Sequence, residues 1–330
     1  MILGAAARMR RFLSAAGLLP VSTLPRPVVS VGNLVMGGAG KTPHVIHLAR
    51  WLTGQGRRVA VLSRGYGRKS RGVRWISDGE GPIASAAEGG DEPVLIARSL
   101  PGVPVAVGES RAAAGREVLS RRRVDVFLLD DGFQHLSLRR DVDLLLVECG
   151  GGLGNRWTAP LGPLREPPSH ARFADALVIT KCPDAESGAR TARAVPFPSV
   201  RPRAFSRLSP GGIVGRDGLP SKEAAAGDAV FAFSGLARNA QFRDTLEAAG
   251  FRVKGFLPFP DHHAYGRGDL ERIAREAGGL PAVTTEKDLV RLPDGVPFSV
   301  GALRVEVEYL AGWEEVSRMI LGRIEGGSRS

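Results

Sequence analysis

The chain has 330 residues, 43% hydrophobic and 24% charged, which excludes an intrinsically disordered or low-complexity protein. Lysine and arginine outnumber aspartate and glutamate by 45 to 34, a formal net charge of +11. This excess favours an anionic partner, such as a nucleic acid, an anionic membrane surface or a phosphorylated substrate. GC-rich coding is the alternative source of the arginines. The cysteines, Cys149 and Cys182, form no CxxC pair, which favours a reducing cytosol over a disulfide framework or a zinc site.

The first 24 residues form an amphipathic segment without acidic residues. Arginines 8, 10 and 11 lie off its apolar face, which consists of Ile2, Ala6, Met9, Leu13 and Ala16. This pattern predicts a helix that lies in a membrane interface, and a helix packed on its own domain is the alternative. No run of 18 apolar residues occurs, so no segment is predicted to span a membrane.

From residue 27 onward, short continuous apolar runs alternate with stretches of helical periodicity. Such runs are typical of parallel strands buried on both faces by helices. The strands are expected at 27–33, 58–63, 103–108, 124–130, 142–148 and 174–180, and the helices at 42–54, 91–99 and 109–122. The alternation predicts an α/β fold with a doubly wound, mostly parallel sheet. Together with the glycine-rich loop described below, this fold would be of the P-loop NTPase type.

The composition changes at residues 196–226, where Pro, Arg, Ser and Gly dominate. We interpret this stretch as a β linker between two domains. The larger domain would cover 25–195, after the N-terminal segment 1–24. A smaller α/β domain would cover 227–330, with strands at 228–234, 251–257 and 280–285 and helices at 239–249, 268–277 and 312–323.

The stretch VGNLVMGGAGKTPH, residues 31–44, lies between an expected strand and an expected helix, as phosphate-binding loops do. Val35 stands where the usual pattern has its first glycine. Glycines in such a loop turn backbone N–H groups toward phosphate oxygens, and the helix N-terminus favours anions. The predicted nucleotide-binding residues are Gly37, Gly38, Ala39, Gly40, Lys41 and Thr42. A glycine-rich turn without a nucleotide is the alternative.

Four further residues carry groups suited to catalysis. Asp130 and Asp131 end a buried strand, where a carboxylate beside a phosphate loop can hold Mg²⁺. Asp91 precedes a helix, so its spacing favours an N-cap over a general base. His262 follows Asp261 in a loop without zinc-ligand spacing. It could orient a carboxylate or belong to a plain surface turn.

A series of segments together resembles the tetraacyldisaccharide 4′-kinase (lipid A 4′-kinase) family. They follow the family's order from residue 27 to about 292: PVVSVGNLVMGGAGKTP, VAVLSRGYGRK, GGDEP, LLDDGFQH, GPLREP, FSGLARNAQF, FPDHH and TTEKD. SRGYGRK and DDGFQH are the most specific. Members of the family also depart from the strict loop pattern at the position of Val35.

The resemblance implies a kinase domain over 25–195 that uses ATP and Mg²⁺. Its substrate would be the 4′-hydroxyl of an acylated glucosamine disaccharide 1-phosphate, reached from the anionic cytoplasmic face of the bacterial inner membrane by peripheral attachment. The resemblance assigns Asp91 as the base paired with His262, Asp130 and Asp131 to the catalytic centre, and Thr42, Asp131 and Glu166 to the metal. Candidate substrate contacts are Arg64, Tyr66, Arg111, Gln134, His135 and Arg165.

Two other functions remain alternatives. A P-loop switch or metallochaperone acting on a protein partner predicts hydrolysis without an acceptor, and leaves Asp91 and His262 without roles. A nucleic-acid-binding module predicts steep salt dependence, but no aromatic stacking motif accompanies the basic clusters. We therefore expect no nucleic acid and no obligate protein partner.

Overall fold

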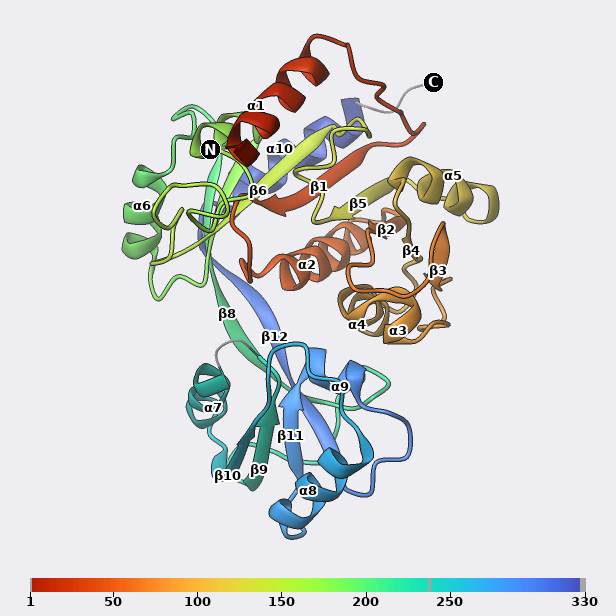
Figure 1. Cartoon of the computed structure of the whole chain (residues 1–330), viewed down its shortest axis with the longest axis vertical. Helices are drawn as coiled ribbons and strands as arrows, with labels where there is room; N and C mark the ends of the chain where they lie inside the picture. The colour runs from red at the N-terminus through yellow and green to blue at the C-terminus, as the bar shows by residue number, and fades with distance from the viewer. Residues whose placement is uncertain (1, 237–238, 327–330) are drawn as a thin grey trace.

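The computed structural model describes residues 2–236 and 239–326. Figure 1 shows two lobes joined by a pair of long strands, β8 (Arg203–Val214) and β12 (Val300–Ala311). These strands are antiparallel and belong to a mixed sheet that continues through both lobes. Its order within the described residues is β10-β9-β11-β12-β8-β7-β6-β1-β5-β2-β4-β3.

The upper lobe contains the parallel part of the sheet that the apolar runs predict. Its strands are β1 (Val28–Asn33), β2 (Val59–Ser63), β3 (Arg74–Ser77), β4 (Val105–Val107), β5 (Val126–Asp130), β6 (Val142–Glu148) and β7 (Ala176–Thr180). Only β3 runs antiparallel to its neighbour, β4, among these pairings. The central strands are buried along their length because helices cover both faces.

The helices of the upper lobe are α1 (Ile2–Ala15), α2 (Lys41–Gly54), α3 (Ala86–Gly89), α4 (Asp91–Ser99), α5 (Arg111–Arg121), α6 (Ala185–Ala194), the 3-10 helix η1 (Pro168–Phe173) and α10 (Trp313–Gly326). Helices α2, α4 and α10 bury one face of the sheet through residues such as Val45, Ile96 and Ile320. Helix α5 covers the opposite face, over Phe127 and Leu129. This two-sided cover confirms the predicted doubly wound α/β fold.

The lower lobe is a smaller α/β unit. It contains β9 (Ala229–Ser234), β10 (Arg252–Pro258) and β11 (Ala282–Thr285), with α7 (Asn239–Ala248), α8 (Arg267–Ala277) and α9 (Glu286–Arg291). Strands β10 and β11 each pair parallel with β9, and β11 also pairs parallel with β12. The predicted domain limits stay predictions. Strand β8 starts inside the expected linker and pairs with both β7 and β12. The C-terminal helix, expected in the smaller domain, packs instead in the core of the upper lobe as α10, because its apolar face is buried against that part of the sheet.

The predicted strands and helices agree with the structure to within a few residues, but several elements were missed. The missed elements are β3, α3, η1, α6, α9 and β12. In β12 the period-two alternation of Val305, Val307 and Tyr309 with Glu306 and Glu308 was available in the sequence. Within the predicted family segment FSGLARNAQF, Ala237 and Arg238 lie outside the described residues.

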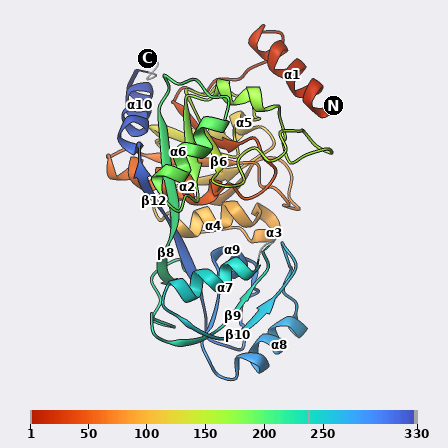
Figure 2. The ribbon, with the colours of Figure 1, turned by 90° about the vertical axis from the view of Figure 1, so that its left-hand side faces the viewer.

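Helix α1 lies at the end of the upper lobe that is remote from the lower lobe (Figures 1 and 2). It contacts the lobe through Gly4 and Arg11, which are both buried. One side of the helix therefore packs on its own domain, as the alternative interpretation predicted. Its predicted apolar face is turned outward: Met9 is 58% exposed and the neighbouring Phe12 67%. The side chain of Ile2 lies outside the described part. No helix of the described chain is long and apolar enough to cross a membrane.

Candidate active site

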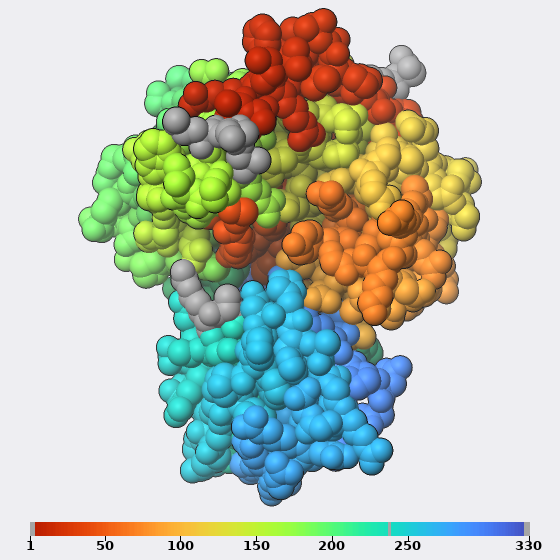
Figure 3. Space-filling model, in the orientation of Figure 1, coloured from red at the N-terminus to blue at the C-terminus, as the bar shows by residue number. Residues whose placement is uncertain are grey.

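The predicted phosphate loop follows the carboxyl end of β1. After β1 the chain continues to β2, toward one edge of the sheet, whereas after the neighbouring strand β6 it continues to β7, toward the other edge. The connections therefore diverge between β1 and β6. Open α/β sheets bind ligands at such a point. Figure 1 shows α2, the helix after the loop, facing the lower lobe, and Figure 3 shows the surface hollowed between the two lobes.

The backbone of the loop explains why Val35 can replace the first glycine. Val35 forms an antiparallel bridge with Leu164, and the N–H of Met36 donates to Pro163 O at 2.7 Å. An extended, paired backbone suits a β-branched residue. The left-handed conformations occur later, at Gly37 (φ 121°) and Gly40 (φ 74°), where glycine is required. The pattern mismatch therefore lies where the structure does not need glycine.

Lys41 and Thr42 begin α2 and are both buried. The Lys41 Nζ lies 3.6 Å from Asp131 Oδ1 and donates to Asn33 Oδ1 at 3.3 Å. Asp131 Oδ2 accepts from Arg165 Nη1 at 2.7 Å. Burial disfavours the charged form of Asp131, but Lys41 and Arg165 outweigh burial and lower its pKa. The structure thus brings three predicted residues together, with Lys41 and Arg165 on either oxygen of the charged Asp131 carboxylate.

Asp130 differs from its neighbour. It is buried, and burial, followed by the charges of Glu92 and Asp131, raises its pKa to about 7. Its Oδ2 accepts from Ser63 Oγ at 3.1 Å, while Oδ1 has no hydrogen-bond partner in the described chain. A buried oxygen without a partner, next in sequence to the carboxylate of Asp131, offers a hard oxygen donor of the kind that Mg²⁺ prefers.

The described residues contain no cluster of three or more His, Cys, Asp or Glu side chains suited to a metal. This finding is compatible with Mg²⁺, which keeps several waters and takes one or two carboxylates with substrate phosphates. Glu166, the third predicted metal residue, is buried elsewhere in the lobe. Its Oε2 accepts from Arg11 Nε at 2.8 Å and lies 2.9 Å from His170 Nδ1. Its role as a metal ligand stays a prediction.

The N-cap interpretation of Asp91 is wrong. Helix α4 begins at Asp91 itself, its N-cap is Gly90, and no side chain caps the helix. Gly90 (φ 90°) is needed because a Cβ there would lie 2.9 Å from Tyr66 O. The Asp91 carboxylate instead reaches the lower lobe, where its Oδ2 lies 3.4 Å from His262 Nδ1. The same oxygen accepts from Arg291 Nε at 2.6 Å.

Of the paired histidines, only His262 contacts Asp91. It has a left-handed backbone (φ 58°), and its side chain is 55% exposed. His263 is structural: it stacks on Phe259 with ring centroids 4.7 Å apart and contacts Asp269 Oδ2 at 3.0 Å. The surface-turn interpretation is thus correct for the backbone and exposure of His262, which in addition contacts Asp91, but it does not fit the side chain of His263.

The predicted substrate contacts divide into buried and exposed groups. Arg111 is buried, and burial together with the charge of Arg64 lowers its pKa to about 10. Burial and the charge of Arg111 also lower the pKa of His135 to about 4, so its imidazole is neutral near pH 7. Gln134 Nε2 donates to Asn33 O at 2.9 Å, next to the phosphate loop. Tyr66 is 81% exposed on the same loop as Arg64.

Several residues near these groups were missed from the sequence. Glu92 interacts with Lys287, Lys41 and Asp131, and its Oε1 accepts from Lys287 Nζ at 2.6 Å across the lobes. Glu92 and Lys287 lie inside the motifs GGDEP and TTEKD, which could have identified them. Arg291 lies just beyond TTEKD and had no such signal.

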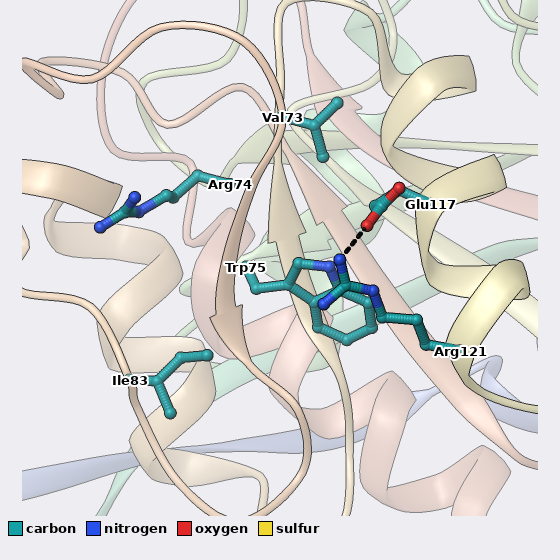
Figure 4. Close-up of a pocket in the computed structure, with 6 residues that line it drawn as sticks. All are labelled: Val73, Arg74, Trp75, Ile83, Glu117 and Arg121. Carbon is teal, nitrogen blue, oxygen red and sulfur yellow. Dashed lines mark ion pairs between the residues drawn. The ribbon is translucent and has the colours of Figure 1, made fainter.

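A shallow surface pocket lies away from these residues, beside β3 (Figure 4). Arg121 stands over the ring of Trp75, with Cζ 5.4 Å from the centroid, and pairs with Glu117 at 2.6 Å. Val73, Arg74 and Ile83 complete the lining. None of the predicted site residues lines this pocket.

Comparisons with known proteins agree with this geometry. The family model described as tetraacyldisaccharide-1-P 4′-kinase matches residues 1–325. A tetraacyldisaccharide 4′-kinase from Anaeromyxobacter dehalogenans (strain 2CP-C) is 43% identical over 321 residues, covering 93% of this chain and 84% of the relative. One from Pelobacter propionicus is 42% identical over 294 residues, covering 86% and 79%.

The chain is also similar to a solved structure. A crystal structure of LpxK from Aquifex aeolicus in complex with ATP is 36% identical, with a TM-score of 0.81, and the match covers 98% of this chain and 96% of that one. The fold, the site geometry and the relatives agree, and the chain belongs to the tetraacyldisaccharide 4′-kinase family of enzymes.

Proposed function

We propose that this protein transfers the γ-phosphoryl group of ATP to the 4′-hydroxyl of an acylated glucosamine disaccharide 1-phosphate, in lipid A biosynthesis. The observation that supports this most is the contact between the lobes. A phosphate loop in the upper lobe and an Asp91–His262 pair that joins both lobes lie at one junction. Glu92, next to Asp91, interacts electrostatically with Lys41 of the loop, which connects the two groups.

In the proposed step, the acceptor oxygen forms a bond to the γ-phosphorus while the bond from that phosphorus to the ADP oxygen breaks. The hydroxyl proton passes to the Asp91 carboxylate, whose Oδ1 makes no hydrogen bond within the described residues and is the oxygen left to accept it. Lys41 and the loop N–H groups stabilise charge on the transferred group. Mg²⁺, held by Thr42 and Asp131, would neutralise charge on the phosphate oxygens.

Basic residues supply the recognition of a phosphorylated sugar. Arg111 and Arg165 lie near the carboxylates of the site, and Arg64 interacts with Arg111. Arginines gathered in this way attract phosphate groups, to which guanidinium groups bind in a bidentate fashion. Tyr66 is exposed on the same loop as Arg64, which supports its assignment as a contact for a bulky acceptor.

Helix α1 supports peripheral attachment to an anionic membrane at the cytoplasmic face. It exposes Met9 and Phe12 beside the exposed Arg8 and Arg10. Apolar side chains flanked by cations are typical of helices that lie in a membrane interface. The helix would bring the upper lobe to the surface from which a lipid substrate is taken.

The activity is tested with [γ-³²P]ATP, Mg²⁺ and tetraacyldisaccharide 1-phosphate in detergent micelles. Label that moves into the lipid fraction supports the kinase. Release of labelled phosphate at the same rate with and without the acceptor, and no labelled lipid, would instead support the P-loop switch and contradict our proposal.

Membrane attachment is tested by sedimentation with vesicles containing anionic phosphatidylglycerol. We expect Phe12→Glu to weaken binding and added salt to weaken it further. Ile83→Glu is the matched control, since Ile83 is 62% exposed beside β3, in the sheet edge away from α1. Equal loss of binding in both variants would rule out α1 as the attachment site.

A further inference from the structure

Arg291 connects the two groups of the proposed proton-accepting pair to the core of the lower lobe. It is the last residue of α9, and its side chain is only 6% exposed. Its Nε donates to Asp91 Oδ2 at 2.6 Å, and its Nη2 lies 3.1 Å from His262 Nδ1. Its Nη1 donates to Asp288 Oδ1 at 3.1 Å and to Gly235 O at 3.3 Å.

The chemistry of these contacts favours one tautomer of the neutral His262 ring. A guanidinium only donates hydrogen bonds and a carboxylate only accepts them. Nδ1 of His262 therefore cannot donate to Asp91 at 3.4 Å and accept from Arg291 at 3.1 Å at the same time. The shorter contact is with Arg291, which makes Nδ1 the acceptor and leaves the imidazole proton on Nε2. The other charged neighbour of the ring is Asp261, 4.0 Å from Nε2.

The Asp288 carboxylate anchors Arg291 in turn. Asp288 is fully buried and also accepts from Gly235 N, Tyr265 Oη and Thr285 Oγ1, at 3.0, 3.0 and 2.7 Å. A guanidinium held on one side by a rigid, buried carboxylate presents its remaining N–H groups in fixed directions. Asp91 Oδ2 and His262 Nδ1 occupy two of these directions.

We propose that Arg291 is a positioning residue: it holds Asp91 and His262 together across the lobes and keeps His262 in the tautomer protonated on Nε2. This rests on the proposed function in one respect, that the pair accepts the hydroxyl proton. With Oδ2 of Asp91 bound to Arg291, Oδ1 is the oxygen that accepts the proton. The Nε2–H of His262 is then free to donate to an oxygen of the substrate.

Kinetics provide the first test. Arg291→Gln is expected to lower kcat on the order of 10²-fold, because misplacing a catalytic group by about 1 Å has an effect of that size. KM for ATP should stay within about threefold, since Arg291 does not contact the phosphate loop. Arg291→Lys keeps the charge but cannot contact Asp91, His262 and Asp288 together, so it should recover only part of kcat.

Arg98→Met is the matched control. Arg98 Nη1 donates to Leu289 O at 3.4 Å, so it also joins α4 to α9, but it contacts neither Asp91 nor His262. We expect this variant to keep kcat within about threefold of wild type, as for loss of one partly buried hydrogen bond. An equal loss of kcat in Arg98→Met and Arg291→Gln would show that Arg291 acts only as a contact between the lobes, and would overturn the proposal.

The tautomer itself is a readout independent of activity. The chain has six histidines, so ¹⁵N-labelled histidine spectra at pH 8 can be assigned with a His262→Gln variant. We expect a proton on Nε2 of His262 in the wild type and a mixture of tautomers in Arg291→Gln. A wild-type proton on Nδ1 would overturn the proposal, as would an unchanged kcat in Arg291→Gln.

The labelling, kinetic and spectroscopic experiments together distinguish a failure of the proposed function from a failure of the role proposed for Arg291. If the wild type labels no lipid, the proposed function fails, while the spectra still test Arg291. If the wild type is active and Asp91→Asn is equally active, Asp91 is not the general base, and Arg291 then has no proton acceptor to position. Should Arg291→Gln fail to fold, Arg291→Lys is judged by the same kinetic and spectroscopic outcomes.

Discussion

The phosphate loop and the junction around Asp91 are built in opposite ways. In the loop, Lys41 and Asn33 are in contact and only 8 residues apart in the chain. At the junction, Asp91 contacts His262 from 171 residues away and Arg291 from 200 residues away. The loop is therefore a local structure with a readable pattern, whereas the junction exists only when two lobes meet.

The two regions also differ in the interactions that stabilise them. Backbone pairing with residues 163–165 and glycine conformations shape the loop. Charged side chains hold the junction, through Arg291–Asp91 and Lys287–Glu92, both at 2.6 Å. A change at the junction should therefore affect the rate of transfer, while a change in the loop should affect ATP as well.

The largest effect is expected from Asp91→Asn. Asparagine keeps the shape and can still accept from Arg291, but it cannot take up a proton. We expect kcat for lipid phosphorylation to fall on the order of 10³-fold, within the range for loss of a general base. Binding of ATP, measured by calorimetry, should change little. Asp78→Asn, at an exposed carboxylate near Arg122, is the control. Retention of more than a fifth of wild-type kcat would remove Asp91 from this role.

Lys41→Met tests the loop. Removing this cation is expected to lower kcat/KM for ATP roughly 10²- to 10³-fold, as for loss of one group that stabilises transition-state charge. Unlike Asp91→Asn, it should also weaken ATP binding. Steady-state kinetics check this, with the exposed Lys222→Met as control. If ATP binding were unchanged, the contrast between loop and junction would not hold.

Asp130→Asn should change stability with pH. Burial, then Glu92 and Asp131, raises the pKa of Asp130 from 3.8 to about 7. The folded protein therefore binds this proton more tightly than the unfolded chain, and the group's contribution to stability is lost as pH rises through about 7. Asparagine cannot ionise, so the variant should gain roughly 2 to 4 kcal/mol over wild type at pH 8. The gain should be smaller at pH 5.

Urea unfolding at both pH values measures this difference. The variant is expected to lose kinase activity, because a residue that destabilises the fold at working pH is kept for function. A gain that is larger at pH 5 than at pH 8 has the wrong sign and would contradict a raised pKa at Asp130.

The smallest effect is expected from Ser206→Ala, which tests whether the loop is connected to the strands between the lobes. His44 Nδ1 lies 2.7 Å from Gly40 O in the loop, and Nε2 lies 3.0 Å from Ser206 Oγ in β8. Burial lowers the pKa of His44 to about 4, so the neutral ring donates to Gly40 and accepts from Ser206.

Losing that hydroxyl should cost about 1 kcal/mol of unfolding free energy and raise KM for ATP by less than about threefold. Thermal unfolding and kinetics measure the two quantities. Ser209→Ala, on the same strand but at an exposed site, is the control. Identical results for the two serines would show that the loop does not depend on β8.

Much of the fold and part of the site could be predicted from the sequence. The apolar runs gave the strands of the parallel sheet, and the glycine-rich stretch gave the loop with Lys41 and Thr42 at the start of α2. Arg291 could not be predicted, because no local pattern in the sequence distinguishes this buried arginine from the arginines on the surface. Glu166 was selected by its motif, yet its neighbours Arg11 and His170 could not be inferred from spacing.

The sequence by itself determined the doubly wound sheet and the phosphate loop. Strands buried on both faces require continuous apolar runs, and a loop with positive φ angles requires glycine, so both leave local marks. Only the tertiary structure decided that the Asp91 side chain contacts the lower lobe and does not cap a helix. It also decided that His262, and not His263, contacts Asp91, and that Arg291 contacts both. These contacts depend on how β8 and β12 place one lobe against the other, and long-range placement leaves no short pattern in the chain.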